Sequence, residues 1–334
     1  MSAVRAGAPP ARGWRRLLGW PLFAAFTAVL IPGLWLALRS QDWTVLAAVT
    51  QRGDPGRIGL LLAGALLVTT IGPVLGMLSW RAIVTDLGVP LTTPQAVRLF
   101  CIGFLSKYVP VKGLALVVAA RLARSSGMSL GRFFGSGTLS LGVTVLTGLA
   151  VGLLAAVELF GAGAGWLALA LAPMALLVFR PGLINWSGEL AMRVLRRPPP
   201  EGAVSARGMR RAVALQSLAW LVSGVHLWLL ALAMDAPAAR SLLLCVGAFG
   251  LATVVGLLVV VVPDGIGVRE SILMAALAAV LPVPAAAVVV LASRLVTTVS
   301  EVGLGALALL GAEVAHRRST RRPDHEGDGQ PCQN

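Results

Sequence analysis

The sequence predicts an all-α polytopic integral membrane protein, with about eight transmembrane helices plus a re-entrant or broken helical hairpin. Of its 334 residues, 57% are hydrophobic and only 13% are charged, whereas a soluble domain carries about 25% charged residues. Several apolar runs approach or reach the ~20 residues that a transmembrane helix needs. These runs lack the alternation of barrel strands, so helices remain as the way to pair every backbone group in lipid.

Eight apolar runs are candidate transmembrane helices, and a ninth is interrupted by charged residues. The eight runs are Leu17–Leu38, Ile58–Trp80, Phe133–Leu159, Trp166–Phe179, Ala212–Met234, Leu242–Val262, Ile266–Leu281 and Ala285–Leu310. The first run follows a basic segment, but it is too long for the apolar core of a signal peptide, and no A-x-A site follows it. We therefore expect it to be retained as a span. The ninth run, Thr93–Ala120, contains the sequence KYVPVKG.

The placement of arginines predicts how the chain is oriented. They cluster in residues 1–16, in a Pro- and Gly-rich linker near 196–211 that divides the membrane domain (17–312), and in a tail (313–334) expected to be disordered. Because cytoplasmic segments carry an excess of Lys and Arg, we expect both termini and the linker in the cytoplasm, with the spans in the inner (cell) membrane. An even number of crossings then separates the clusters. The interrupted run Thr93–Ala120 should therefore enter and leave on the same side.

The formal net charge of +14 comes mostly from arginine. A basic protein can bind nucleic acid, but these arginines adjoin apolar runs, which favours contact with an anionic membrane face. The three cysteines, Cys101, Cys245 and Cys332, are far apart in the sequence. Their spacing predicts neither a zinc site nor a disulfide framework, and we expect buried small hydrophobes.

Charged residues within the apolar runs are the candidates for a binding site, because a charge at the bilayer centre costs at least ~2.5 kcal/mol. The candidate ligand-binding residues are Lys107, Tyr108, Lys112 and Arg121 in the interrupted run, Gly265, Gly267, Arg269 and Glu270 in PDGIGVRE, and Arg294 and Glu301 in the last span. The last two residues are two helical turns apart and share a face. The two lysines have few acidic neighbours in sequence, which favours an anionic ligand such as phosphate.

Gly265 and Gly267 follow Pro263 closely and predict a break in the helix. A helix that starts inside the membrane presents free backbone N–H groups to an anion. Two interrupted apolar segments, one in each half of the chain, are typical of a transport site. The pair here is Thr93–Ala120 and Pro263–Leu281.

Structural roles are the alternative for several of these charges. Arg121 can extend to the membrane interface, where its guanidinium remains in water. Arg269–Glu270 and Arg294–Glu301 can form structural ion pairs, because paired charges are tolerated without a ligand.

The sequence gives little indication of catalysis. Gly127–Gly131 matches the G-x-S-x-G pattern, but a basic helical segment precedes it where a hydrolase has a strand. H-E-x-x-H, a P-loop and clustered carboxylates are absent from the sequence, so we expect no enzyme activity, metal, nucleotide site or cofactor. His226 lies in an apolar run, and we expect a hydrogen-bonded residue of the span.

Three passages together resemble the membrane domain of lysylphosphatidylglycerol synthases and its stand-alone relatives. They are LSWRAIVTDLG (Leu78–Gly88), KYVPVKG followed by RLARSSGMSLGRFF, and PDGIGVRESIL followed by ASRLV. The similarity extends from about Leu17 to Leu310. The family pattern has glycine after the proline of KYxP, where this chain has Val111; Gly113 is then the residue that permits the bend.

The resemblance implies a flippase-like domain that moves aminoacylated phosphatidylglycerol between leaflets. The synthase activity of the family belongs to a soluble domain after the membrane part, which we expect this chain to lack. The expected ligand is an anionic phospholipid or a polyprenyl-phosphate-linked lipid. The alternatives are a membrane-embedded transferase with a lipid-phosphate donor, and a non-catalytic membrane partner of a lipid-modifying enzyme.

Overall fold

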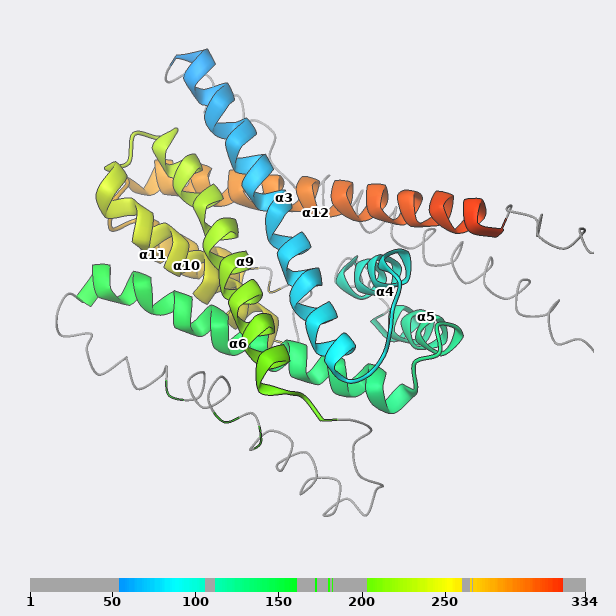
Figure 1. The fold of residues 1–334 in the computed structure, drawn as a ribbon. Coiled ribbons are helices and arrows are strands. Elements are labelled where there is room, and N and C mark those ends of the chain that lie inside the picture. The colour runs from blue at the N-terminus through cyan, green and yellow to red at the C-terminus, as the bar shows by residue number, and fades with distance from the viewer. Residues whose placement is uncertain are drawn as a thin grey trace, which may run out of the picture.

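A computed structural model describes residues 54–105, 112–160, 203–259, 265 and 267–320, with isolated residues between 161 and 202. The described residues form eight α-helices and no strand. The helices are α3 (Pro55–Asp86), α4 (Thr93–Leu105), α5 (Lys112–Ser125), α6 (Leu130–Phe160), α9 (Ala206–Leu232), α10 (Ala238–Leu258), α11 (Val268–Leu277) and α12 (Val283–Thr320) (Figure 1). Five of them, α3, α6, α9, α10 and α12, are long and apolar enough to cross a membrane. The protein is therefore an all-helical, multi-pass membrane protein, as predicted.

Some predictions fall outside the described residues. They are the spans Leu17–Leu38 and Trp166–Phe179, the basic segment 1–16, the residues Lys107 and Tyr108, and the end of the tail from residue 321. The backbone of Lys112 is described as the first residue of α5.

Helices α3 and α9 form a pair that is joined at both ends (Figure 1). At one end, Arg57 Nη1 lies 3.1 Å from Asp235 Oδ1. At the other end, Ser205 Oγ donates to Asp86 Oδ1 at 2.8 Å, and the same hydroxyl accepts from the Gly208 N–H. The start of α3 thus meets the end of α9, and the end of α3 meets the start of α9, so the two helices are antiparallel.

Small residues allow the helices to approach closely within this chain. A Cβ atom added to Gly72 of α3 would lie 1.8 Å from Ser223 Oγ of α9, and one added to Gly148 of α6 would lie 2.4 Å from Val254 Cγ2 of α10. Helix interfaces in lipid favour such small residues. Gly135 of α6 differs, since nothing described lies within 4 Å of a Cβ added there.

The interrupted run forms a pair of short helices, α4 and α5, and its two ends lie at one end of the bundle. Leu91 and Leu99 pack in one buried cluster with Ala123 and Met128, against Trp80 near the end of α3. The segment therefore enters and leaves beside the same end of α3, as predicted. Figure 1 shows α4 beside the later half of α12, with α5 next to α4.

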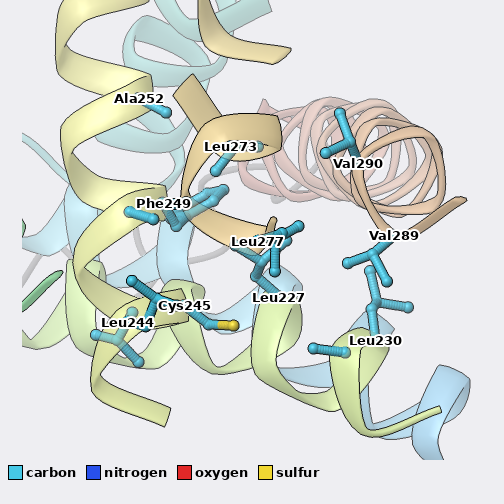
Figure 2. Packing of buried hydrophobic residues seen from close by; sticks show 14 of the residues in the cluster. Leu227, Leu230, Leu244, Cys245, Phe249, Ala252, Leu273, Leu277, Val289 and Val290 are labelled. Carbon is cyan, nitrogen blue, oxygen red and sulfur yellow. The ribbon is translucent and has the colours of Figure 1, made fainter. Parts of the chain in front are cut away.

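The second interrupted segment differs from the span predicted at Ile266–Leu281. Helix α11 has only ten residues, or about 15 Å, about half of the ~30 Å hydrocarbon core. It runs antiparallel to α10, since Gly265 lies against Gly256 and Arg269 lies over Phe249. Figure 2 shows the same direction, with Leu273 beside Phe249 and Leu277 toward Cys245. Helix α11 therefore begins beside the later half of α10, between the contacts at Gly256 and Phe249.

Two helices extend beyond their predicted ends. Helix α9 begins at Ala206, where the linker was expected to reach 211, because Ser205 Oγ accepts from the Gly208 N–H and caps the helix. Helix α12 continues to Thr320, so the tail expected to be disordered from residue 313 begins as helix. The first residues of this tail, EVAHRR, are compatible with continuing a helix that has already formed.

Candidate functional site

The turn before α11 uses backbone conformations that favour glycine. Gly265 has φ +63° and Gly267 has φ +87°, both in the left-handed region. A Cβ at Gly265 would lie 2.4 Å from Gly256 Cα, so the two backbones are in direct contact. The break predicted from these two glycines is present, and it places the first turn of α11 against α10.

The first turn of α11 already holds a carboxylate of its own chain. Glu270 Oε2 accepts from the Gly267 N–H at 2.7 Å, and Glu270 Oε1 lies 3.5 Å from Arg294 Nη1 of α12. The Arg294 side chain is 11% exposed and that of Glu270 is 25% exposed. Sequence spacing suggested the pairs Arg269–Glu270 and Arg294–Glu301. The described ion pair connects Glu270 to Arg294, which was not among the suggested pairs, and so joins α11 to α12.

Arg269 points to a different partner than Arg294 does. Its side chain is buried, and its guanidinium carbon lies 5.1 Å from the centre of the Phe249 ring on α10. Nη2 of this guanidinium is buried and has no hydrogen-bond partner within the part of the chain that the structure describes. A cation over an aromatic face is stabilised by the ring, but this contact leaves the N–H donors of Nη2 unused.

His226 of α9 also contacts this aromatic ring. The imidazole is fully buried and meets the Phe249 ring edge-on, with 4.7 Å between the ring centres. Nδ1 contacts the Ser223 carbonyl oxygen, and Nε2 lies 2.8 Å from Ser293 Oγ of α12. Because a carbonyl accepts only, Nδ1 carries the proton and Nε2 accepts from the serine. The prediction of a hydrogen-bonded residue within the span is confirmed.

Glu301 lies on α12 where the first interrupted segment approaches it. Gly305, one helical turn after Glu301, packs against Leu105 at the end of α4, since an added Cβ would lie 2.8 Å from Leu105 Cδ1. The residues that follow Leu105 include Lys107 and Tyr108. Both interrupted segments therefore contact α12, the second near Arg294 and the first near Gly305.

One of the predicted residues, Arg121, is not drawn into this arrangement by the described contacts. Arg121 is exposed in the later half of α5. Helix α5 begins at Lys112.

The serine of the G-x-S-x-G pattern has a structural role, because Ser129 Oγ accepts from the Arg132 N–H at the start of α6. This cap takes the place of the strand-to-helix turn that a hydrolase needs.

Sequence reasoning missed Phe249, which contacts the Arg269 guanidinium, and Ser293, which hydrogen-bonds to His226. Both residues lie in apolar runs, and nothing in their spacing distinguishes them from helix-packing residues. Ser205 could have been found, because a serine followed by a helical segment is a common start signal.

These features define a multi-pass helical membrane protein with two interrupted segments and buried arginines at one of them. The sequence matches the family model described as the lysylphosphatidylglycerol synthase TM region over residues 22–305, and the chain belongs to this family. The matched range includes every described helix as far as residue 305 of α12. A search of curated protein sequences gave no match. The family indicates a membrane protein involved in lipid handling.

Proposed function

We propose that this protein is a flippase that binds the headgroup of an anionic or aminoacylated phospholipid, or of a polyprenyl-phosphate-linked lipid, and carries it across the inner membrane. The observation that supports this most directly is the start of α11 beside the later half of α10, an apolar helix long enough to span the membrane. At this helix start, Arg269 lies over Phe249 of α10, and Glu270 pairs with Arg294 of α12. Charged groups at that depth are costly, and phosphate is a ligand that arginine binds well.

Each candidate residue has a role in this proposal. Lys107, Lys112, Arg269 and Arg294 contact the phosphate, and the Tyr108 hydroxyl donates a further hydrogen bond. Glu270 and Glu301 hold the arginines in position, or contact a cationic group on the headgroup. The contact between Leu105 and Gly305 supports this assignment, because Leu105 precedes Lys107 by two residues and packs against α12.

The proposed activity is transport without a chemical step on the lipid. Transport then depends on a gradient or on downhill flow, and a separately encoded lipid-modifying enzyme is the natural partner. Both termini are proposed to lie in the cytoplasm.

A liposome assay tests the transport. The purified protein is reconstituted with fluorescent phosphatidylglycerol, and the fraction reached by an impermeant quencher is followed over time. Charge-assisted hydrogen bonds contribute about 1.5–3 kcal/mol, so Lys107→Gln and Lys112→Gln should each lower the affinity for the lipid at least tenfold. Arg124→Gln is the matched control, because Arg124 is exposed in the last turn of α5.

Two results would contradict the proposal. One is wild-type affinity and flipping in the lysine double variant with an unchanged melting temperature. The other is a divalent-metal-dependent change in the lipid itself, since that would identify a membrane-embedded transferase.

A further inference from the structure

The proposed function leaves one buried titratable side chain unused, that of His226 in the transmembrane helix α9. The imidazole is fully buried and contacts residues of both α10 and α12. Ionisable residues inside a transmembrane bundle are rare because they are costly, and they often mark ion or proton pathways. An imidazole is also the side chain that ordinarily gains and loses a proton near neutral pH.

Both ring nitrogens of His226 have partners that suit the neutral and the charged imidazole. In the neutral form, the Nδ1–H donates to the Ser223 carbonyl, and Nε2 accepts from Ser293 Oγ at 2.8 Å. After a proton binds at Nε2, the serine oxygen can accept from it, because a hydroxyl both donates and accepts. The serine proton then turns to the Val289 carbonyl one helical turn earlier, a bond that helical serines readily make. The imidazole therefore keeps its hydrogen bonds in both states.

Arg269 of α11 is the charged residue closest in effect to this imidazole. The guanidinium carbon lies 5.1 Å from the centre of the Phe249 ring, and the imidazole centre lies 4.7 Å from the same point. Like charges repel at such short range, most strongly where water is excluded. A proton on His226 therefore opposes the contact of Arg269 with Phe249, which holds the start of α11 against α10.

The other titratable groups around His226 do not neutralise this added charge. Besides Arg269, the titratable side chains that the structure describes on α3, α6, α10, α11 and α12 are Cys245, Glu270, Arg294, Glu301 and, toward helix ends, Arg57, Arg81, Asp86, Arg132, Glu158 and Arg240. Glu270 is paired with Arg294. Within the described part of the chain, the imidazole nitrogens contact a carbonyl and a hydroxyl rather than a carboxylate.

A stripe of hydroxyl groups continues from His226 along α12. Ser293, Thr297 and Ser300 are buried and spaced by four and three residues, so they share one face of the helix. Ser300 Oγ donates to Thr70 Oγ1 of α3 at 3.3 Å. The stripe runs toward the part of α12 that α4 contacts. Polar side chains that face the interior of a transmembrane bundle can line a path for protons.

We propose that His226 is the proton-binding site of the transport cycle, so that lipid movement is coupled to the movement of protons. The neutral imidazole belongs to the arrangement described here, with Arg269 over Phe249. A proton that arrives along the hydroxyl stripe binds Nε2 and weakens the contact of α11 with α10. It leaves the same nitrogen toward the other side of the membrane when the contact forms again. The inference rests on the proposed function and identifies the gradient that drives it.

A pH difference across the liposome membrane tests this coupling in the wild-type protein. A trace of fluorescent phosphatidylglycerol is added, and valinomycin with equal potassium on both sides holds the membrane potential at zero. If one proton moves for each lipid, a difference of one pH unit should change the final ratio of lipid between the leaflets about tenfold. Reversing the pH difference should reverse the change. Lipid that flips to an equal distribution at every pH difference would overturn the inference.

Replacing His226 by glutamine identifies the residue that carries the proton. His226→Gln should still flip the lipid but reach an equal distribution, because glutamine can hydrogen-bond to Ser293 and binds no proton. The double variant His316→Gln/His325→Gln is the matched control, since it removes the other two histidines of the chain. It should respond to the pH difference as the wild type does. A response that persists in His226→Gln would overturn the assignment.

Ser293→Ala supplies a pH profile that a merely structural histidine would not give. This variant keeps the imidazole but removes the hydroxyl that accepts from its charged form. The rate of flipping at equal pH on both sides should depend on pH in the wild type. Its midpoint should lie about one pH unit lower in Ser293→Ala, because a hydrogen bond from a charged donor is worth more than one to the neutral ring. An unchanged midpoint would show that another group binds the proton.

The outcomes separate this inference from the proposed function. If the wild type flips the lipid without any response to pH, the flippase proposal stands and the proton site is wrong. If the wild type moves no lipid under any pH difference, the flippase proposal is wrong and the inference falls with it. A response to pH that is lost in His226→Gln alone supports both.

Discussion

Glu270 joins three structural features through one carboxylate. It caps the Gly267 N–H, pairs with Arg294, and places a negative charge at the positive end of the α11 dipole. The two charges are mostly buried, so the loss of one partner leaves the other poorly solvated. The negative charge of Glu270, rather than its side-chain volume, should therefore determine how strongly the first turn of α11 is stabilised.

Replacing Glu270 by glutamine tests this role. Glu270→Gln keeps the shape of the side chain but removes its ion pair with Arg294, and should reduce the free energy of unfolding by about 1–3 kcal/mol. Adding Arg294→Met to the variant should restore part of the loss, because the buried arginine charge that faced Glu270 is removed. Unfolding in detergent with a double-mutant cycle measures the coupling. Additive effects of the two substitutions would mean that the 3.5 Å contact contributes no stability.

At the scale of the helix, small residues determine how closely neighbours pack. Gly72 of α3 faces Ser223 and the Ala219 carbonyl of α9, and this contact lies between the two polar connections at the ends of the pair. In lipid, such packing replaces the hydrophobic effect as the source of helix association. A single methyl group at this position should therefore separate α3 from α9.

Gly72→Ala should destabilise the protein, because its Cβ would lie 1.8 Å from Ser223 Oγ. Overpacking of this kind costs about 1–3 kcal/mol. Ser223→Gly should rescue the variant, since it removes the atoms in conflict. Gly59→Ala is the control within the same helix, because nothing described lies within 4 Å of a Cβ there, and it should be neutral or stabilising. Equal melting temperatures for the two alanine variants would show that the α3–α9 contact is looser than described.

The interrupted segments were predictable because their causes are local. Proline, glycine and charge in KYVPVKG and PDGIGVRE each disfavour a continuous apolar helix, and both segments consist of short helices. The partner of Glu270 was not predictable, because Arg294 is 24 residues away and two helices must pack before they meet. The same holds for Arg269 over Phe249, since a lone aromatic in an apolar run carries no sequence signal of its own.

At the scale of the whole molecule, the two ends of the α3–α9 pair differ in charge. One end holds Asp86 with the arginines of the first turns of α9, namely Arg207, Arg210 and Arg211, all exposed. The other end holds Asp54, Asp235 and Arg57. The arginine-rich end is the one that the positive-inside rule assigns to the cytoplasm. Since α4 and α5 return to this end, we expect the first interrupted segment to begin and end on the cytoplasmic side.

Labelling of single cysteines tests this orientation. In a background with Cys332→Ser, Ala203→Cys lies just before α9 and Ala239→Cys lies at the start of α10; both positions are exposed. The native Cys101 and Cys245 are buried and should react slowly. An impermeant maleimide added to intact cells should label the cysteine at 239, whereas the cysteine at 203 should react only after the membrane is permeabilised. The reverse pattern would place the linker outside the cell. Labelling of both positions from outside would mean that α9 does not cross the membrane, which the length and composition of this helix oppose.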